Sequence, residues 1–93
     1  MKTRVKPSLQ VSVRDVRRLK ERRAAWGLAY TDFGWIEIEP NQSPKNYLET
    51  LCHEWLHCAL PTLGERSIVK LEKSLGGMLW RRGYRRRTKL QKT

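Results

Sequence analysis

Histidine, cysteine and long apolar runs are all scarce in this sequence of 93 residues. No stretch approaches the roughly 18–20 consecutive apolar residues of a membrane-spanning helix, so we expect no membrane partner. The opening MKTRVKPSLQVSVRD is basic but lacks the apolar core of a signal peptide. The two cysteines, Cys52 and Cys58, fall in one predicted helix about 9 Å apart, beyond the roughly 7 Å that a disulfide spans. These features predict a reduced, cytoplasmic protein.

The chain length excludes a multidomain enzyme and a large substrate cavity. Hydrophobic residues make up 39% of the sequence, too many for a disordered chain. We therefore expect a single domain over residues 1–93, with its core at about 12–82. A basic lead-in (1–11) and a basic tail (83–93) would flank that core.

Acidic residues are scarce at both ends of the chain, although the net charge is +11. Residues 1–23 contain nine basic and two acidic groups, and residues 81–93 contain seven basic groups and no acidic one. Basic termini favour nucleic acid or another polyanion as a partner, although solvated faces explain them equally well. The candidate nucleic-acid-binding residues are Arg81, Arg82, Arg85, Arg86 and Arg87.

The first half of the chain predicts a helix followed by a β-hairpin. Ser12 is a candidate N-cap for a basic helix that runs to about Arg23. Residues 26–31 and 35–39 flank a turn that contains Gly34, and the second run alternates with Ile36 and Ile38 on one face. This pattern is typical of a half-buried hairpin.

Two further helices are predicted in the second half. Ser43 and Pro44 mark the start of a helix that ends near residue 61, and Thr62 with Glu65 forms a capping-box pattern before the last helix. The last helix has an apolar stripe made of Ile68, Leu71, Leu75, Met78 and Leu79. The pair Gly76-Gly77 within it favours close approach of another backbone. The predicted order, helix, hairpin, helix and helix, gives a small α+β domain.

The chain's only two histidines belong to one motif, His53-Glu54-Trp55-Leu56-His57, which has the pattern HExxH. On a helix, His53 and His57 lie one turn apart on the same face, where both imidazoles can bind one zinc ion. Glu54 lies beside that position and can act as a general base. Two ordinary histidines on an amphipathic helix are the alternative reading.

A third ligand is required, because catalytic zinc usually has three protein ligands. The candidates are Cys52, Cys58, Glu49, Glu65 and Glu72. The cysteines suit packing better, and Glu49 suits a hydrogen bond to a histidine. Glu65 is preferred because it lies close to His57 across a short connection, with Glu72 as the alternative. Two histidines and a carboxylate also suit non-haem iron, but Glu54 beside the metal favours a hydrolase.

The sequence resembles the small HExxH metallopeptidases of phages and prophages, which look like minimal gluzincins. The resemblance covers residues 24–85 and is carried by AYTDFG (29–34), IEI (36–38), QSP (42–44), LETLCHEWLH (48–57) and PTLGE (61–65), then by Val69, Leu79-Trp80 and 83–85. It implies a minimal zincin fold and a zinc site made by His53, His57 and Glu65, with Glu54 as the general base. Unlike SprT-like zincins, the chain has no third histidine, and unlike large zincins it has no full sheet or second subdomain.

These observations predict a zinc-dependent metallopeptidase that hydrolyses a peptide or protein substrate in the host cytoplasm. A peptide could pair along the strand at residues 35–39. The alternative is a non-catalytic phage protein that zinc stabilises and that binds nucleic acid or a host protein. Either protein could be a monomer or a small homo-oligomer.

Overall fold

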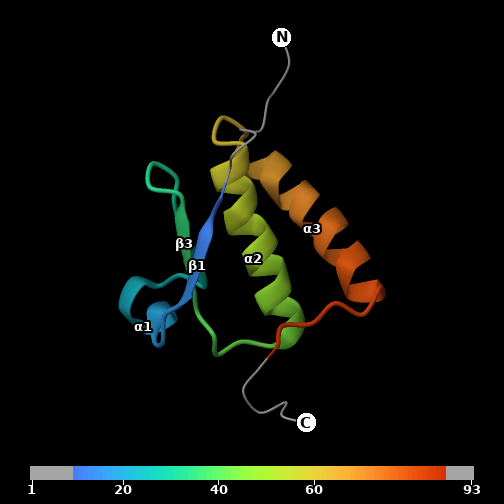
Figure 1. Ribbon diagram of the computed structural model, residues 1–93, viewed down its shortest axis with the longest axis horizontal. Coiled ribbons are helices and arrows are strands. Elements are labelled where there is room, and N and C mark those ends of the chain that lie inside the picture. The colour runs from blue at the N-terminus through green and yellow to red at the C-terminus, as the bar shows by residue number, and fades with distance from the viewer. Residues whose placement is uncertain (1–9, 88–93) are drawn as a thin grey trace.

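Three short strands and three helices form the part of the chain that the computed structural model describes, residues 10–87 (Figure 1). In chain order they are β1 (Ser12–Asp15), α1 (Leu19–Arg23), β2 (Gly27–Tyr30), β3 (Trp35–Ile38), α2 (Pro44–Ala59) and α3 (Glu65–Arg81). The predicted α+β class is confirmed. Most of the predicted basic lead-in and the end of the predicted tail lie outside the described residues.

The strands form one mixed sheet in the order β1-β3-β2. The β2–β3 hairpin is antiparallel, with Tyr30 opposite Trp35, and its turn closes where the backbone N–H of Gly34 donates to the carbonyl of Tyr30. Gly34 has a φ of +74°, a conformation that glycine adopts without steric cost. The hairpin prediction is therefore confirmed, and β3 is the central strand.

The core lies between the sheet and α2. Ile36 and Ile38 are completely buried, as their alternation predicted, and they form one cluster with Tyr47 and Cys58 of α2. Both cysteines are buried and free, and burial raises the pKa of each thiol. They contribute to packing, as the sequence indicated.

The predicted N-terminal helix is wrong for its first half. Residues 12–15 instead form β1, which runs parallel to β3 with Ser12 opposite Trp35. Bonds across the strands hold it, from Ser12 N to Gly34 O at 3.0 Å and from Val16 N to Ile38 O at 2.9 Å. The local capping pattern at Ser12 did not reveal these partners, because they are more than twenty residues away in the sequence.

The remaining helix, α1, is a single short segment tied to the end of β3 by Glu39. The Glu39 carboxylate accepts hydrogen bonds from the backbone N–H groups of Lys20 at 2.9 Å and of Asn41 at 3.1 Å. Glu39 is buried, and the Lys20 bond is the main cause that lowers its pKa. This one carboxylate therefore fixes α1 against the chain that leads into α2.

The two long helices lie side by side, with α2 between the sheet and α3 (Figure 1). The predicted start of α2 is confirmed, because the Ser43 hydroxyl accepts a bond from Asn46 N and Pro44 is the first helical residue. A Cβ added to Gly76 would lie 3.4 Å from Cγ and 3.9 Å from Cα of Glu49. The predicted close approach is confirmed at Gly76. None of the helices within residues 10–87 combines the length and hydropathy that crossing a membrane requires.

Two details of α3 differ from the prediction. Its N-cap is Gly64 and no side chain caps it, so Thr62 and Glu65 do not form a capping box. Ile68 is completely buried, but Leu71 and Met78 are exposed. The apolar stripe is only partly covered because α3 packs mainly against one neighbour, α2.

Replacing Tyr47 with phenylalanine is expected to lower the free energy of unfolding at pH 7 by about 1 kcal/mol. The Tyr47 hydroxyl donates to Oδ1 of Asp15 at 2.6 Å, and burial together with this bond raises its pKa from 10.0 to about 12. A raised pKa in the folded state stabilises below pH 10, and the stabilisation disappears as the pH rises through 12. Urea unfolding at several pH values should therefore show the two proteins converging in alkali. Equal stability at pH 7 would contradict this role, and Tyr84→Phe, which changes an exposed tyrosine, is the control.

Candidate metal centre

The two histidines lie together on one face of α2, as the HExxH spacing predicts. Their ring centroids are 4.8 Å apart, and the Nε2 atoms of His53 and His57 are separated by 3.2 Å. Their side chains are 19% and 27% exposed, so the pair is half-buried yet open on one side. Two nitrogen donors therefore converge on one point.

Glu65, the first residue of α3, completes a cluster with both histidines. Its Oε2 lies 3.0 Å from Nε2 of His53, and its Oε1 lies 3.0 Å from Nε2 of His57. The short connection after α2 reverses the chain and places this carboxylate over the histidine pair. The structure thus brings together the three side chains that the sequence selected, and their donor atoms lie within 4.8 Å of one another.

The spacing and chemistry of these donors fit a divalent metal ion. In a tetrahedral zinc site, with ligand atoms about 2.0–2.2 Å from the metal, the ligand atoms are about 3.3 Å from one another. The two Nε2 atoms are 3.2 Å apart, and each lies 3.0 Å from a different carboxylate oxygen of Glu65. Two imidazoles and one carboxylate are a known catalytic zinc set. The cluster could therefore accept a zinc ion with little rearrangement.

Glu72 lies on the other side of the His53 ring. Its Oε1 is 2.7 Å from Nδ1 of His53, and its side chain is only 14% exposed. With the proton on Nδ1 donated to this carboxylate, Nε2 of His53 carries the lone pair that faces Glu65 and His57. Glu72 is thus placed to orient the His53 ring, and it does not belong to the group of metal donors made by His53, His57 and Glu65. Glu49, considered for such a bond, instead packs against Gly76.

Glu54 lies where α2 packs against β2, next to Gly27. A Cβ added to Gly27 would lie 2.6 Å from Cγ2 of Thr50 and 2.9 Å from Cγ of Glu54, so only glycine fits there without displacement. Burial is the main cause that raises the pKa of Glu54, while the two histidines act in the opposite direction. A cavity of about 260 Å³ adjoins this carboxylate, lined by Trp26, Gly27, Thr50, His53, Glu54 and Glu72. The carboxylate is therefore held in a confined space beside the histidine pair.

Two features of this site were not predicted: the close fit at Gly27, and the contact by which Glu72 orients His53. Gly27 was not singled out, although a glycine in a strand often marks the close approach of another segment. The role of Glu72 was also missed, although it follows Glu65 by seven residues and so lies on the same face of α3. Both signals were present, but the packing of β2 and α3 on α2 was needed to interpret them.

The five arginines proposed for nucleic acid lie at and beyond the end of α3. Arg81 is its last residue and Arg82 its C-cap. The Arg85 guanidinium stacks on the Trp80 ring at 3.3 Å, and that of Arg86 lies 3.9 Å from the Tyr47 ring centroid. Of the candidates, Arg86 is thus packed against the body of the domain, and Arg87 is exposed.

Comparisons of this chain with family models, with curated proteins and with solved structures give no match. The interpretation of the site therefore depends on its residues and their geometry. That geometry provides two histidines and a glutamate close enough together to hold a metal ion, with a second glutamate in contact with one of the histidines.

Proposed function

We propose that this protein is a zinc-dependent metallopeptidase with a minimal zincin-like domain. The observation that carries the proposal is the convergence of His53, His57 and Glu65, whose donor atoms lie within 4.8 Å of one another, beside the half-buried Glu54. A structural zinc site usually has four protein ligands, whereas a catalytic one has three and an open position. The three-residue cluster supports the catalytic type.

Bound zinc would supply Lewis-acid chemistry, polarising a peptide carbonyl and making a water molecule more acidic. Glu54 would accept the proton of the attacking water and return it to the leaving amine nitrogen. Because burial raises its pKa, Glu54 is better suited to carry that proton near neutral pH than an ordinary carboxylate. Glu72 would keep the His53 ring in the orientation that presents Nε2.

The proposed peptide would lie along β2 and not along β3. The sequence-based expectation of pairing at residues 35–39 is wrong, because β3 is covered by β1 on one side and by β2 on the other. Within the described residues β2 is the edge strand that approaches Glu54, through Gly27. A peptide that adds to this edge as a further strand would pass close to the general base.

Removal of the metal tests the proposal. The purified protein is expected to contain one zinc ion per chain and to cleave members of a mixed peptide library, read out by mass spectrometry. Chelation should abolish cleavage, and added zinc should restore it in protein that circular dichroism shows to be refolded. Undiminished cleavage by zinc-free protein would overturn the proposal. Stoichiometric zinc without any cleavage would support the alternative, a non-catalytic protein that zinc stabilises.

A further inference from the structure

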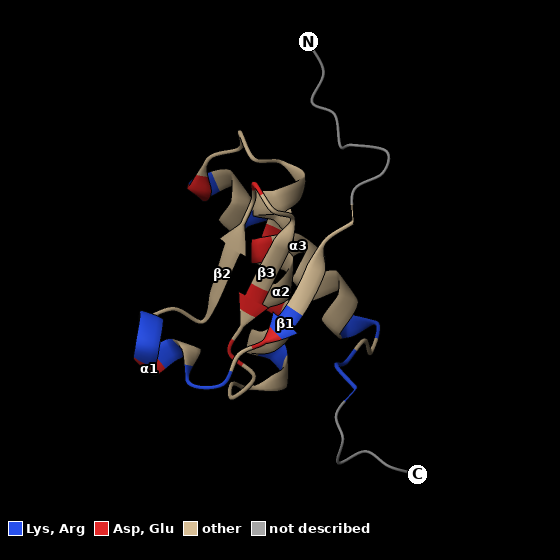
Figure 2. Ribbon diagram, turned by 60° about the vertical axis from the view of Figure 1, so that its left-hand side comes forward, with Lys and Arg blue, Asp and Glu red and all other residues tan. Residues whose placement is uncertain are grey.

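Most of the lysine and arginine residues lie toward one end of the described molecule (Figure 2). The segment 14–23 contains six basic and two acidic residues, and the segment 81–87 contains five basic residues and no acidic one. These segments are separated by more than fifty residues in the sequence. We call them together the basic surface.

Contacts with one short connection bring the two segments together. Nη2 of Arg86 donates to the carbonyl of Pro40 at 3.2 Å, and the backbone N–H of Lys20 donates to Glu39. Tyr47, under the Arg86 guanidinium, also bonds Asp15 at the end of β1. The sequence suggested two independent basic ends, but the fold combines them into one surface around Pro40.

The acidic groups near the basic surface are used within the fold. Asp15 accepts from Tyr47, and Glu39 accepts from two backbone N–H groups. Within residues 10–87, the basic segments make one ion pair with a carboxylate, between Arg18 and Glu21 at 2.9 Å. Most of their guanidinium and ammonium groups therefore face solvent without a local counter-charge, as a polyanion-binding surface requires.

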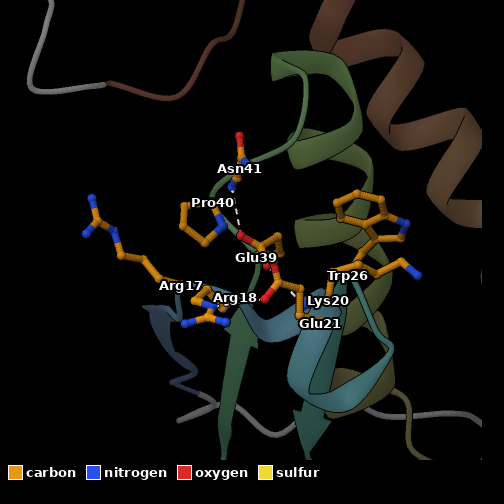
Figure 3. A pocket seen from close by; sticks show the side chains of 8 residues that line it. All are labelled: Arg17, Arg18, Lys20, Glu21, Trp26, Glu39, Pro40 and Asn41. Carbon is orange, nitrogen blue, oxygen red and sulfur yellow. Dashed lines mark hydrogen bonds and ion pairs between the residues drawn. The ribbon is translucent and has the colours of Figure 1, made fainter.

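A pocket of about 630 Å³ adds an aromatic element to this surface. Figure 3 shows Trp26 on one side of it and Arg17 on the other, with Glu39 and Pro40 between them. Trp26 is 44% exposed, and Nζ of Lys20 lies 5.5 Å from its ring. A flat aromatic group could stack on the indole while cations bind the phosphates attached to it.

We propose that the basic surface binds single-stranded nucleic acid, with phosphates on its arginines and one base stacked against Trp26. An unpaired strand is favoured because stacking on a protein aromatic ring requires a base face that duplex pairing keeps covered. Proteins that bind single-stranded nucleic acid combine a basic groove with exposed aromatic rings. None of the donor atoms of the histidine cluster belongs to the basic surface, but Trp26 also lines the cavity beside Glu54, so the two sites adjoin at this residue.

Fluorescence anisotropy with a labelled single-stranded oligodeoxynucleotide tests the proposal in metal-free and zinc-loaded protein. If four phosphates are neutralised, affinity should fall about 50-fold between 50 and 200 mM salt. Trp26→Ala should weaken binding about tenfold. Arg17→Glu with Arg22→Glu should weaken it further, whereas Lys70→Glu with Lys73→Glu, on the exposed side of α3, makes the same charge change and should have a much smaller effect.

Four outcomes would overturn the proposal. They are an equal loss in both double variants, unchanged affinity in Trp26→Ala, tighter binding to the matching duplex, and binding to anionic phospholipid vesicles without binding to the oligonucleotide. Phe33→Ala provides the aromatic control, because Phe33 is 71% exposed in the turn at the other end of the hairpin. Because the assay contains no peptide, a failure of the peptidase proposal would not affect its result.

Discussion

Glu54→Gln is expected to bind zinc as the unmodified protein does and to cleave peptides at least about 100-fold more slowly. Glutamine keeps the size of the side chain but cannot accept the proton of an attacking water. The Glu54 carboxylate does not belong to the group of donor atoms made by His53, His57 and Glu65. Loss of cleavage with retention of metal is therefore the result that a general base predicts and a structural acid does not.

The matched control for this experiment is Glu49→Gln. Glu49 lies on the same helix, five residues earlier, and packs against Gly76 of α3. Both variants remove one negative charge from α2, so a general effect of charge would appear in both. Equal cleavage by Glu54→Gln and the unmodified protein would exclude Glu54 as the general base.

Gly27→Ala tests the Glu54 carboxylate by a change in β2, the strand that packs against it. The added Cβ would lie 2.9 Å from Cγ of Glu54, closer than real Cβ contacts come, and 3.1 Å from its Oε2, so the Glu54 side chain must shift. We expect reduced cleavage while zinc remains bound, because the clash involves Thr50 and Glu54 and none of the three donor residues. Loss of zinc in this variant would mean that β2 supports the metal donors as well as the carboxylate.

Local patterns predicted the parts of this site that lie within one helix. The spacing of His53 and His57 and the start of α2 at Ser43 need only helical geometry, and both agree with the structure. Strand β1 could not be predicted in this way, because its partners at residues 34–38 lie in another part of the chain. The capping pattern at Ser12 competed with pairing to β3, and the longer-range backbone bonds prevailed.

The position of Glu65 was predictable for a different reason. A short connection between two helices leaves few ways for the second to fold back, and a residue at its start must lie near the end of the first. The function of Glu72 depends additionally on the rotation of α3 about its axis, which the close contact between Gly76 and Glu49 helps to fix. The rotation of α3 could not be predicted from its apolar stripe alone, because Leu71 and Met78 belong to the stripe but are exposed.

His57→Ala is expected to lower zinc affinity by at least about 100-fold, since it removes one of three donors and leaves a site that water must complete. Glu65→Ala should have a comparable effect, because its two oxygens face both histidines at 3.0 Å. Glu72→Ala should cost about 10–100-fold, the usual effect of removing a group that orients a ligand. Competition titration with a zinc-binding dye gives all three affinities, and Asp32→Ala, an acidic residue in the hairpin turn, is the control.

The same variants test whether zinc stabilises the fold. At a free zinc concentration 100 times Kd, binding to the folded state alone adds about 2.7 kcal/mol, which raises Tm by about 10–20 °C in a domain of this size. His57→Ala should lose this increase at the same zinc concentration, while its Tm without zinc should change much less. If Glu72→Ala lost more affinity than Glu65→Ala, Glu72 would replace Glu65 as the third ligand. The hydrogen bond between Nδ1 of His53 and Glu72 would then have to break so that the ring could turn. The 2.7 Å length of that bond argues against Glu72 as the third ligand.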